Sequence, residues 1–193
     1  MIITYHRIKD NEFSCSPKEF ERQLEMAKNF GWTLTFDDGL KEHFTIAFPL
    51  LQKLNLRAMF FPITGSTKNL QGEKWKNQEF MTLGEIKKLH EAGMIIGGHT
   101  HTHPRLSSLS NADQTKEISL STSILENVLK DKLSVFSYPF GDYNNDTIDI
   151  LRKVGYKMAF TAKPQDPFQI FRNDTNDLKD WIVEKRSNDV RQV

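Results

Sequence analysis

The sequence predicts an α/β fold, a distorted and incomplete (β/α) barrel with about seven parallel strands. Apolar, β-rich runs alternate with helical patterns along the chain, and a connection follows each run, which is typical of a parallel sheet. Candidate functional residues lie at or just beyond the ends of these runs, where a βα barrel builds its site; they are His6, Asp37, Asp38, His99 and Phe140. An open doubly wound sheet would also place ligands at that edge, so the barrel is the preferred of two architectures.

Seven runs have the composition of strands, because β-branched and aromatic residues predominate in them. In chain order they are Met1–Tyr5, Trp32–Phe36, Ala58–Ile63, Met94–Gly97, Ser134–Tyr138, Tyr156–Thr161 and Phe168–Phe171. The longest stretch without a pattern, Thr64–Met81, is expected to form a surface loop and is a candidate substrate lid.

Helical patterns with recognisable ends fill the intervals. Ser16-Pro17 opens the first helix, because proline is favoured at the first helical position, and Gly31 ends it. The others run near Leu40–Leu54, from the capping box Thr82–Glu85 to Gly93, near Asn111–Lys130, near Asp146–Val154 and near Asn176–Arg186.

The bulk composition predicts one ordinary globular domain. A length of 193 residues is enough for a real core, so residues 1–193 are expected to form a single domain. Apolar residues make up 38% of the chain, and a net charge of +1 indicates neither nucleic acid nor an anionic membrane as the main partner. The single cysteine, Cys15, excludes an internal disulfide and is expected to be a packed thiol.

No segment has the properties of a membrane anchor or a leader. No apolar stretch approaches the ~20 residues that a membrane-spanning helix needs. The N-terminus, Met1–His6, has no basic region and no long apolar region, so it is not typical of a signal peptide. We therefore expect a cytoplasmic location. The sequence does not indicate an oligomeric state.

Two adjacent carboxylates, Asp37 and Asp38, follow the second strand-like run. One of them could cap a helix, because aspartate favours the N-cap position and the next residues lead into a helical pattern. That alternative leaves the second charge unexplained, since adjacent carboxylates repel and usually need a cation or strong donors nearby. We therefore expect one carboxylate to bind a cation while its neighbour acts as a base.

A histidine cluster, His99, His101 and His103, follows Gly97-Gly98. If the strand continued through this cluster, all three side chains would point to the same side, but Pro104 limits that continuation. A helical turn instead places His99 and His103 on one side, within reach of one ion. A surface histidine cluster is the alternative. With the two aspartates, a hydrolytic metal site is the leading hypothesis, because Asp and His are suitable ligands.

Both motifs resemble those of a known family. Thr35–Gly39, which reads TFDDG, is similar to the first signature of the polysaccharide deacetylases (the nodulation-deacetylase homology domain, or family-four carbohydrate esterases). His99–His103 is similar to their second signature, His-Ser/Thr-x-x-His, and the similarity extends over nearly the whole chain. The resemblance implies a metal-dependent hydrolase that removes an N-acetyl group from an amino sugar in a polysaccharide or glycan precursor.

The resemblance also implies roles for the residues of these two motifs. Asp38, His99 and His103 would bind a divalent metal, usually zinc, with cobalt and nickel as alternatives. Asp37 would be the general base. Thr100 would support the histidine loop by hydrogen bonding.

The third family signature, Arg-x-Pro-Phe/Tyr, is similar to Ser137–Phe140. Pro139 and Phe140 match it, and by the resemblance the backbone N–H of Phe140 would be an oxyanion donor. Ser137 stands where the family has an arginine that helps to orient the base. Another residue must then take this role, and Arg172 is the candidate.

The last two signatures are less direct. Asp177–Trp181 matches the fourth, Asp-x-x-Asp-Trp, although it also fits the core face of a terminal helix. The fifth carries a histidine that acts as general acid near the C-terminus, but no histidine follows His103. Ile3–His6 has its form at the opposite end, and the first and last strands of a closed barrel are neighbours. The chain therefore resembles the permuted, biofilm-polysaccharide subgroup, with His6 as the acid; a packed strand-end residue is the alternative.

Other residues have simpler expected roles. His43 and His90 lie on helical patterns and are expected at the surface. Aromatic side chains near the mouth of the site could stack on sugar rings, and Trp75, Tyr138, Phe140 and Tyr143 are the candidates.

The expected partner is an N-acetylated amino sugar, and two other functions remain open. One is hydrolysis of a different amide, such as a formyl group or another acyl amine. The other is a catalytically weak carbohydrate-binding relic, which the missing arginine favours and the retained Asp37 opposes.

Overall fold

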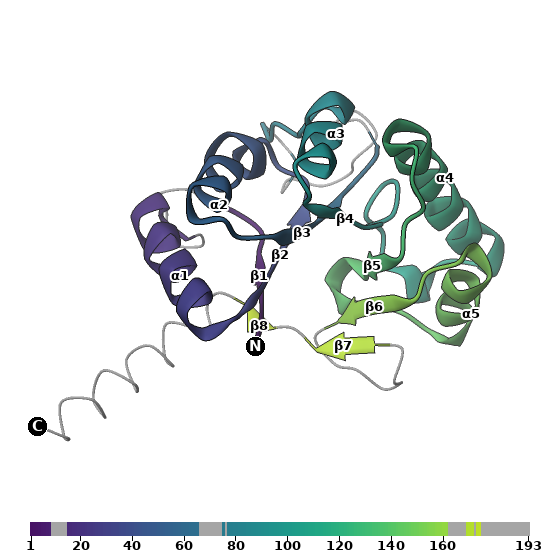
Figure 1. Ribbon diagram of the computed structural model, residues 1–193. Coiled ribbons are helices and arrows are strands. Elements are labelled where there is room, and N and C mark those ends of the chain that lie inside the picture. The colour runs from purple at the N-terminus through teal and green to yellow at the C-terminus, as the bar shows by residue number, and fades with distance from the viewer. Residues whose placement is uncertain (9–14, 66–74, 76, 162–168, 172, 175–193) are drawn as a thin grey trace, which may run out of the picture.

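The computed structural model describes residues 1–8, 15–65, 75, 77–161, 169–171 and 173–174. Its strands form two parallel sheets, with the orders β4-β3-β2-β1-β8 and β5-β6-β7 (Figure 1). The first sheet contains β1 (Ile2–Tyr5), β2 (Thr33–Asp38), β3 (Ala58–Pro62), β4 (Ile95–Ile96) and β8 (Asn173–Asp174). The second contains β5 (Val135–Ser137), β6 (Met158–Thr161) and β7 (Gln169–Phe171).

Helices lie in an arc outside the two sheets (Figure 1). The α-helices are α1 (Pro17–Phe30), α2 (Phe48–Leu54), α3 (Leu83–Glu91), α4 (Asn111–Leu129) and α5 (Asn145–Val154). A π-helix, η1 (His43–Ala47), directly precedes α2, and two short 3-10 turns are η3 (Leu106–Ser108) and η4 (Pro139–Gly141). None of the helices in the described part of the chain is both long and apolar enough to cross a membrane.

Helix ends follow local signals in the sequence. The hydroxyl of Ser16 accepts a hydrogen bond from the backbone N–H of Glu19 at the start of α1, and Gly31 ends that helix with a φ of 64°. Thr82 and Glu85 form the expected capping box of α3. The expected helix near Asn176–Arg186 lies outside the described residues.

The core of the five-stranded sheet is built from stacked aromatic rings. Phe36 of β2 lies 5.2 Å from Tyr5 of β1 and 4.7 Å from Phe60 of β3, measured between ring centroids. These rings meet because the strands pair in register, with Phe36 opposite both partners. Phe20 of α1 packs against Tyr5 at 5.0 Å, so this core extends from the sheet to the helices. Cys15 is a buried thiol, as expected.

The chain passes from one sheet to the other at Gly97-Gly98. The N–H of Gly97 donates to the carbonyl of Phe60 in β3 at 2.9 Å, and the N–H of Gly98 donates to the carbonyl of Val135 in β5 at 3.0 Å. An isolated parallel bridge pairs Gly98 with Phe136. Because its hydrogen bonds are divided between two neighbours, the segment that begins as β4 is short.

All the strand pairings are parallel, as expected, and the described strands form two sheets, so the expected distorted and incomplete barrel is not confirmed. Six described strands contain three or more residues, whereas β4 and β8 contain two each, so the expected count of about seven is wrong. The two sheets meet at the bridge between Gly98 and Phe136.

Gly97 has no room for a side chain, which provides a test of this crossing. A Cβ atom there would lie 2.4 Å from Phe61 Cε1 and 2.5 Å from the carbonyl oxygen of Val135. We expect Gly97→Ala to lower the free energy of unfolding by about 1–3 kcal/mol, because neighbouring groups must move apart. Gly84→Ala is the control, since a Cβ there would meet only Thr82 Oγ1, at 3.9 Å. Urea unfolding measures both variants, and equal stabilities would contradict this account.

Candidate metal centre

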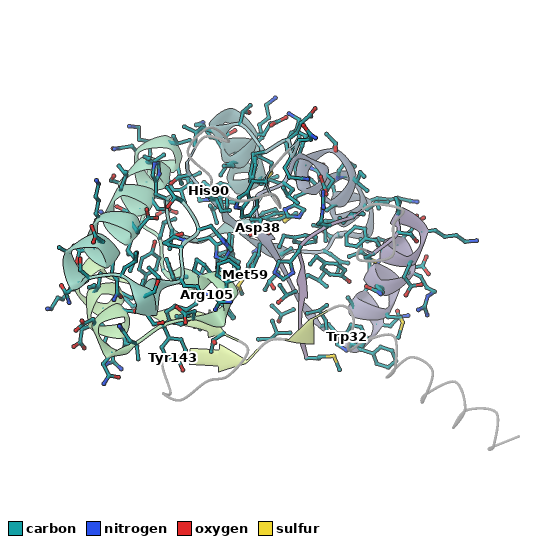
Figure 2. All side chains as sticks on the ribbon, turned by 180° about the vertical axis from the view of Figure 1, so that it is seen from behind. Trp32, Asp38, Met59, His90, Arg105 and Tyr143 are labelled. Carbon is teal, nitrogen blue, oxygen red and sulfur yellow. The ribbon has the colours of Figure 1, made fainter. Side chains whose placement is uncertain are left out.

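Three side chains with metal-binding atoms come together where the two sheets meet. Asp38 is the last residue of β2, His99 follows the two glycines of the crossing, and His103 ends the histidine loop, residues 99–103. One ligand atom from each of these residues lies within 4.8 Å of the other two, and all three residues are buried. Figure 2 labels Asp38 near the centre of the molecule.

The ligand atoms face one another without forming hydrogen bonds of good geometry. His103 Nε2 lies 3.2 Å and His99 Nε2 lies 3.5 Å from Asp38 Oδ1, yet this oxygen has no hydrogen-bond partner among the described residues. A buried carboxylate oxygen left in this way is costly unless a cation or another donor compensates it. One aspartate and two histidines fit a divalent transition metal such as zinc, and three protein ligands leave a coordination position open for chemistry.

Electrostatics keep Asp38 in the form that a metal ligand requires. Burial by itself would raise its pKa, but the facing imidazoles of His103 and His99 outweigh burial and hold the pKa of Asp38 well below its usual range. The carboxylate is therefore ionised at neutral pH, as metal binding demands.

His99 is held in the tautomer that suits a ligand. Its Nδ1 lies 2.8 Å from the backbone carbonyl oxygen of Ser137. A carbonyl oxygen can only accept, so Nδ1 carries the proton and donates it. When the ring is neutral, Nε2 therefore has its lone pair on the side that faces Asp38, which is the usual arrangement of a metal-bound histidine.

The histidine loop is a tight turn and not a continued strand. Thr100 and His103 have positive φ angles of 64° and 62°, and the hydroxyl of Thr100 accepts a hydrogen bond from the N–H of His103 at 3.0 Å. The ring of His101 instead contacts the hydroxyl of Thr64, with 3.0 Å between Nδ1 and Oγ1. The turn therefore places the rings of His99 and His103 beside Asp38 and the ring of His101 beside Thr64.

Glu117 of α4 holds this turn from outside, a contact that the sequence does not predict. Its carboxylate accepts hydrogen bonds from the backbone N–H groups of His101 and Thr102, at 2.9 and 2.8 Å, and from the Thr102 hydroxyl at 2.8 Å. In the sequence, Glu117 resembles any charged residue on the solvent side of a helix. No local signal distinguishes it.

Asp37 lies beside the ligand set and has a partner of its own. Only 2% of its surface is exposed, and the hydroxyl of Ser137 donates to Asp37 Oδ2 at 3.0 Å. The residue that stands in place of the family arginine therefore contacts the expected base directly. Neither aspartate caps a helix, since Glu42 and Ala47 occupy the N-cap positions of η1 and α2.

His6 shares a cavity with Asp38. The cavity has a volume of about 200 Å³ and is lined by His6, Arg7, Asp38, Leu40, Trp75 and Gln78. His6 follows β1, which lies between β2 and β8, so the first and last strands are neighbours as the permutation argument requires. Arg7 donates to Gln78 Oε1 beside the same cavity.

Aromatic rings surround His103. Phe140, which has a φ of 58° and is 52% exposed, lies 4.6 Å from the His103 ring, and Trp75 lies 5.2 Å from it. The guanidinium carbon of Arg105 lies 4.6 Å above the ring of Phe140. Pro139, which precedes Phe140, is buried at the start of η4.

Tyr138 and His43 differ from the sequence predictions. Tyr138 is 1% exposed and stacks on Tyr143 at 4.7 Å, so it is a core residue and does not line the mouth. His43 is fully buried, because η1 turns its ring towards Phe36 and away from solvent. His90 is half-buried on α3. Arg172 and the motif Asp177–Trp181 lie outside the described residues.

The ligand assignment predicts how substitutions change metal binding. Loss of a residue that only hydrogen-bonds to a metal ligand typically weakens metal binding by about 10- to 100-fold. We expect Asp38→Ala to weaken divalent metal binding by more than this, because it removes the only charged ligand of the set. Asp37→Asn is the matched control and should keep the metal. Titration of the metal-free proteins with zinc and with cobalt measures both affinities. Equal loss in the two variants would contradict the assignment.

Comparison with known proteins identifies the family. The family model for polysaccharide deacetylase matches residues 14–159. YxkH of Bacillus subtilis (strain 168) is 26% identical over 187 residues, which cover 84% of this chain and 64% of that protein. The poly-beta-1,6-N-acetyl-D-glucosamine N-deacetylase of Staphylococcus aureus (strain NCTC 8325 / PS 47) is 26% identical over 154 residues, covering 75% of this chain and 51% of that protein. The chain therefore spans about half to two thirds of the length of these relatives.

Solved structures share the fold. The deacetylase PplD of Streptococcus pyogenes, solved in complex with acetate, has a TM-score of 0.79 at 25% identity, covering 90% of each chain. IcaB from Ammonifex degensii has a TM-score of 0.76 at 24% identity, covering 89% of each chain. Both have the α/β fold with parallel strands in common with this protein. Because the family model covers most of its 193 residues, this chain belongs to the polysaccharide deacetylase family.

Proposed function

We propose that this protein is a metal-dependent hydrolase that removes acetyl groups from the N-acetylated amino sugars of a polysaccharide. The observation that carries the proposal is the pair of buried carboxylates. Asp38 faces two histidines, and Asp37 accepts a hydrogen bond from Ser137. A structural metal site would need Asp38 but would have no use for a second, separately oriented carboxylate.

The three ligands Asp38, His99 and His103 would hold a divalent ion, with zinc as the expected metal and cobalt or nickel as alternatives. When bound, such an ion supplies a Lewis acid that lowers the pKa of water and polarises an acyl oxygen. The tautomer of His99 suits this role, because its Nδ1–H is used by the carbonyl of Ser137.

The remaining residues would move protons and stabilise charge. Asp37 takes a proton from the attacking water, and Ser137 keeps its carboxylate oriented for this step. The backbone N–H of Phe140 is a candidate donor to the oxyanion. His6, from the shared cavity, protonates the amine as the C–N bond breaks. The products are acetate and a free amino sugar.

An N-acetylglucosamine polymer is the substrate class that we propose. The curated S. aureus relatives are named for deacetylation of poly-beta-1,6-N-acetyl-D-glucosamine. The exposed ring of Phe140 beside His103 could stack on a sugar ring, which aromatic side chains do with their apolar faces. The missing arginine favoured a non-catalytic relic, whereas the hydrogen bond from Ser137 to Asp37 supports a base that is oriented without that arginine.

The first test is acetate release. With zinc or cobalt, we expect the protein to release acetate from β-1,6- or β-1,4-linked N-acetylglucosamine oligomers. A chelator should stop the reaction and added metal should restore it. Asp37→Asn should lower kcat by about 10²- to 10⁴-fold while the metal stays bound, because only the base is lost. Full activity in that variant would refute the role of Asp37, and no release from any oligomer by metal-loaded protein would refute the proposed function.

The role of Ser137 has a separate test. Ser137→Ala should lower kcat/KM by about 10- to 100-fold with unchanged metal affinity, because the hydroxyl is lost while the carbonyl that orients His99 remains. Ser137→Thr retains a hydroxyl and should recover part of the rate. Ser121→Ala, at a buried serine of α4, is the control for removing a buried hydroxyl. The same loss in the Ser121 variant would contradict a specific role for Ser137.

A further inference from the structure

His43 is a buried histidine that the proposed reaction does not use. It begins the π-helix η1, and none of its surface is exposed. Its ring packs against Phe36 at 5.3 Å and Phe60 at 6.4 Å. An apolar ring would fill this space without the penalty of burying ring nitrogens. Short π-helical segments often occur at functional sites, so a specific use of this side chain is worth seeking.

One ring nitrogen of His43 contacts the main chain of His6. His43 Nε2 lies 3.0 Å from the backbone carbonyl oxygen of His6. Since that oxygen can only accept, Nε2 carries the proton and donates it. His43 Nδ1 has no hydrogen-bond partner among the described residues, so the contact with His6 is the one hydrogen bond that the ring makes there.

The charge state of His43 agrees with this arrangement. Burial lowers its pKa from the ordinary value, although the hydrogen bond to His6 opposes that change. A neutral imidazole with its proton on Nε2 is therefore the form present around neutral pH. This form donates to His6 and adds no charge to the core.

The position of His43 makes the contact useful for the site. It lies shortly after Asp37 and Asp38 in the chain, in the segment that follows β2, whereas His6 follows the neighbouring strand β1. The hydrogen bond therefore joins the turn that carries the two carboxylates to the turn that carries His6. The side chain of His6 is itself exposed and lines the cavity that it shares with Asp38, and the conformation of its main chain sets where that side chain begins.

We propose that His43 is a positioning residue, whose Nε2–H fixes the main chain of His6 so that the His6 imidazole is directed into the cavity beside Asp38. This inference rests on the proposed function, in which His6 donates the proton to the leaving amine. His43 touches neither substrate nor metal in this account. It acts only through His6.

Two substrates with different leaving groups distinguish a role in positioning His6 from a general loss of activity. An amine must be protonated as it leaves, whereas 4-nitrophenolate leaves without an acid. We would compare acetate release from N-acetylglucosamine oligomers with hydrolysis of 4-nitrophenyl acetate, using zinc-loaded protein. His43→Phe should lower the amide rate by about 10- to 100-fold, because misplacing a reacting group by about 1 Å has this effect. The ester rate should change by less than about threefold.

Companion variants make the comparison specific. His6→Ala should show the same selective loss of amide hydrolysis. The size of that loss is the maximum that we expect for His43→Phe. His43→Gln keeps an N–H donor and should recover part of the amide rate. His90→Gln, on α3, should leave both rates unchanged. If His43→Phe does not fold, His43→Met replaces it, because it also removes the donor and retains an apolar side chain.

A structural readout tests the contact without relying on activity. The carbonyl ¹³C resonance of His6 should shift in His43→Phe and stay close to the wild-type position in His43→Gln. No shift in His43→Phe, equal losses of amide and ester hydrolysis, or an unchanged amide rate would each overturn the proposal. If the wild-type protein releases no acetate from any amide, the proposed function fails instead, and the ¹³C result still decides whether His43 fixes His6.

Discussion

Burial of two adjacent carboxylates is the constraint on which the rest of the site depends. Asp37 and Asp38 end β2 with almost no contact with solvent, and charges in such a position must be compensated. Different partners meet them: the imidazoles of His99 and His103 face Asp38, and the hydroxyl of Ser137 donates to Asp37. The two chemically identical groups thus have different surroundings, which supports the proposed roles of Asp38 as a metal ligand and Asp37 as the base.

That compensation requires the two sheets to meet where they do. The N–H of Gly97 donates to β3 and the N–H of Gly98 donates to β5. Neighbouring aromatic rings and backbone leave no space for a side chain at either position. Ser137, at the end of β5, then reaches both sides of the site. Its hydroxyl donates to Asp37 and its carbonyl accepts from His99, so any change in the relative position of the sheets would disturb both side chains together.

The functional side chains are carried by short turns after strands, and hydrogen bonds from other segments hold these turns. Glu117 binds two successive N–H groups of the histidine loop from α4. His43 binds the carbonyl of His6 from η1. Both are buried or partly buried polar contacts over long sequence distances, and such contacts restrict a turn to one conformation. Preorganised turns of this kind avoid having to order the groups during the reaction.

The sequence by itself determined several helix ends, the parallel character of the strands and the choice of the three residues that we propose as metal ligands. Caps such as those at Ser16 and Thr82 form between residues three positions apart, so the sequence predicts them directly. Only the tertiary structure decided that Ser137 contacts Asp37 across 100 positions of sequence, that His43 is buried, and that the strands form two sheets. Such features depend on contacts between segments that are far apart in the sequence, and local caps and patterns do not contain this tertiary context.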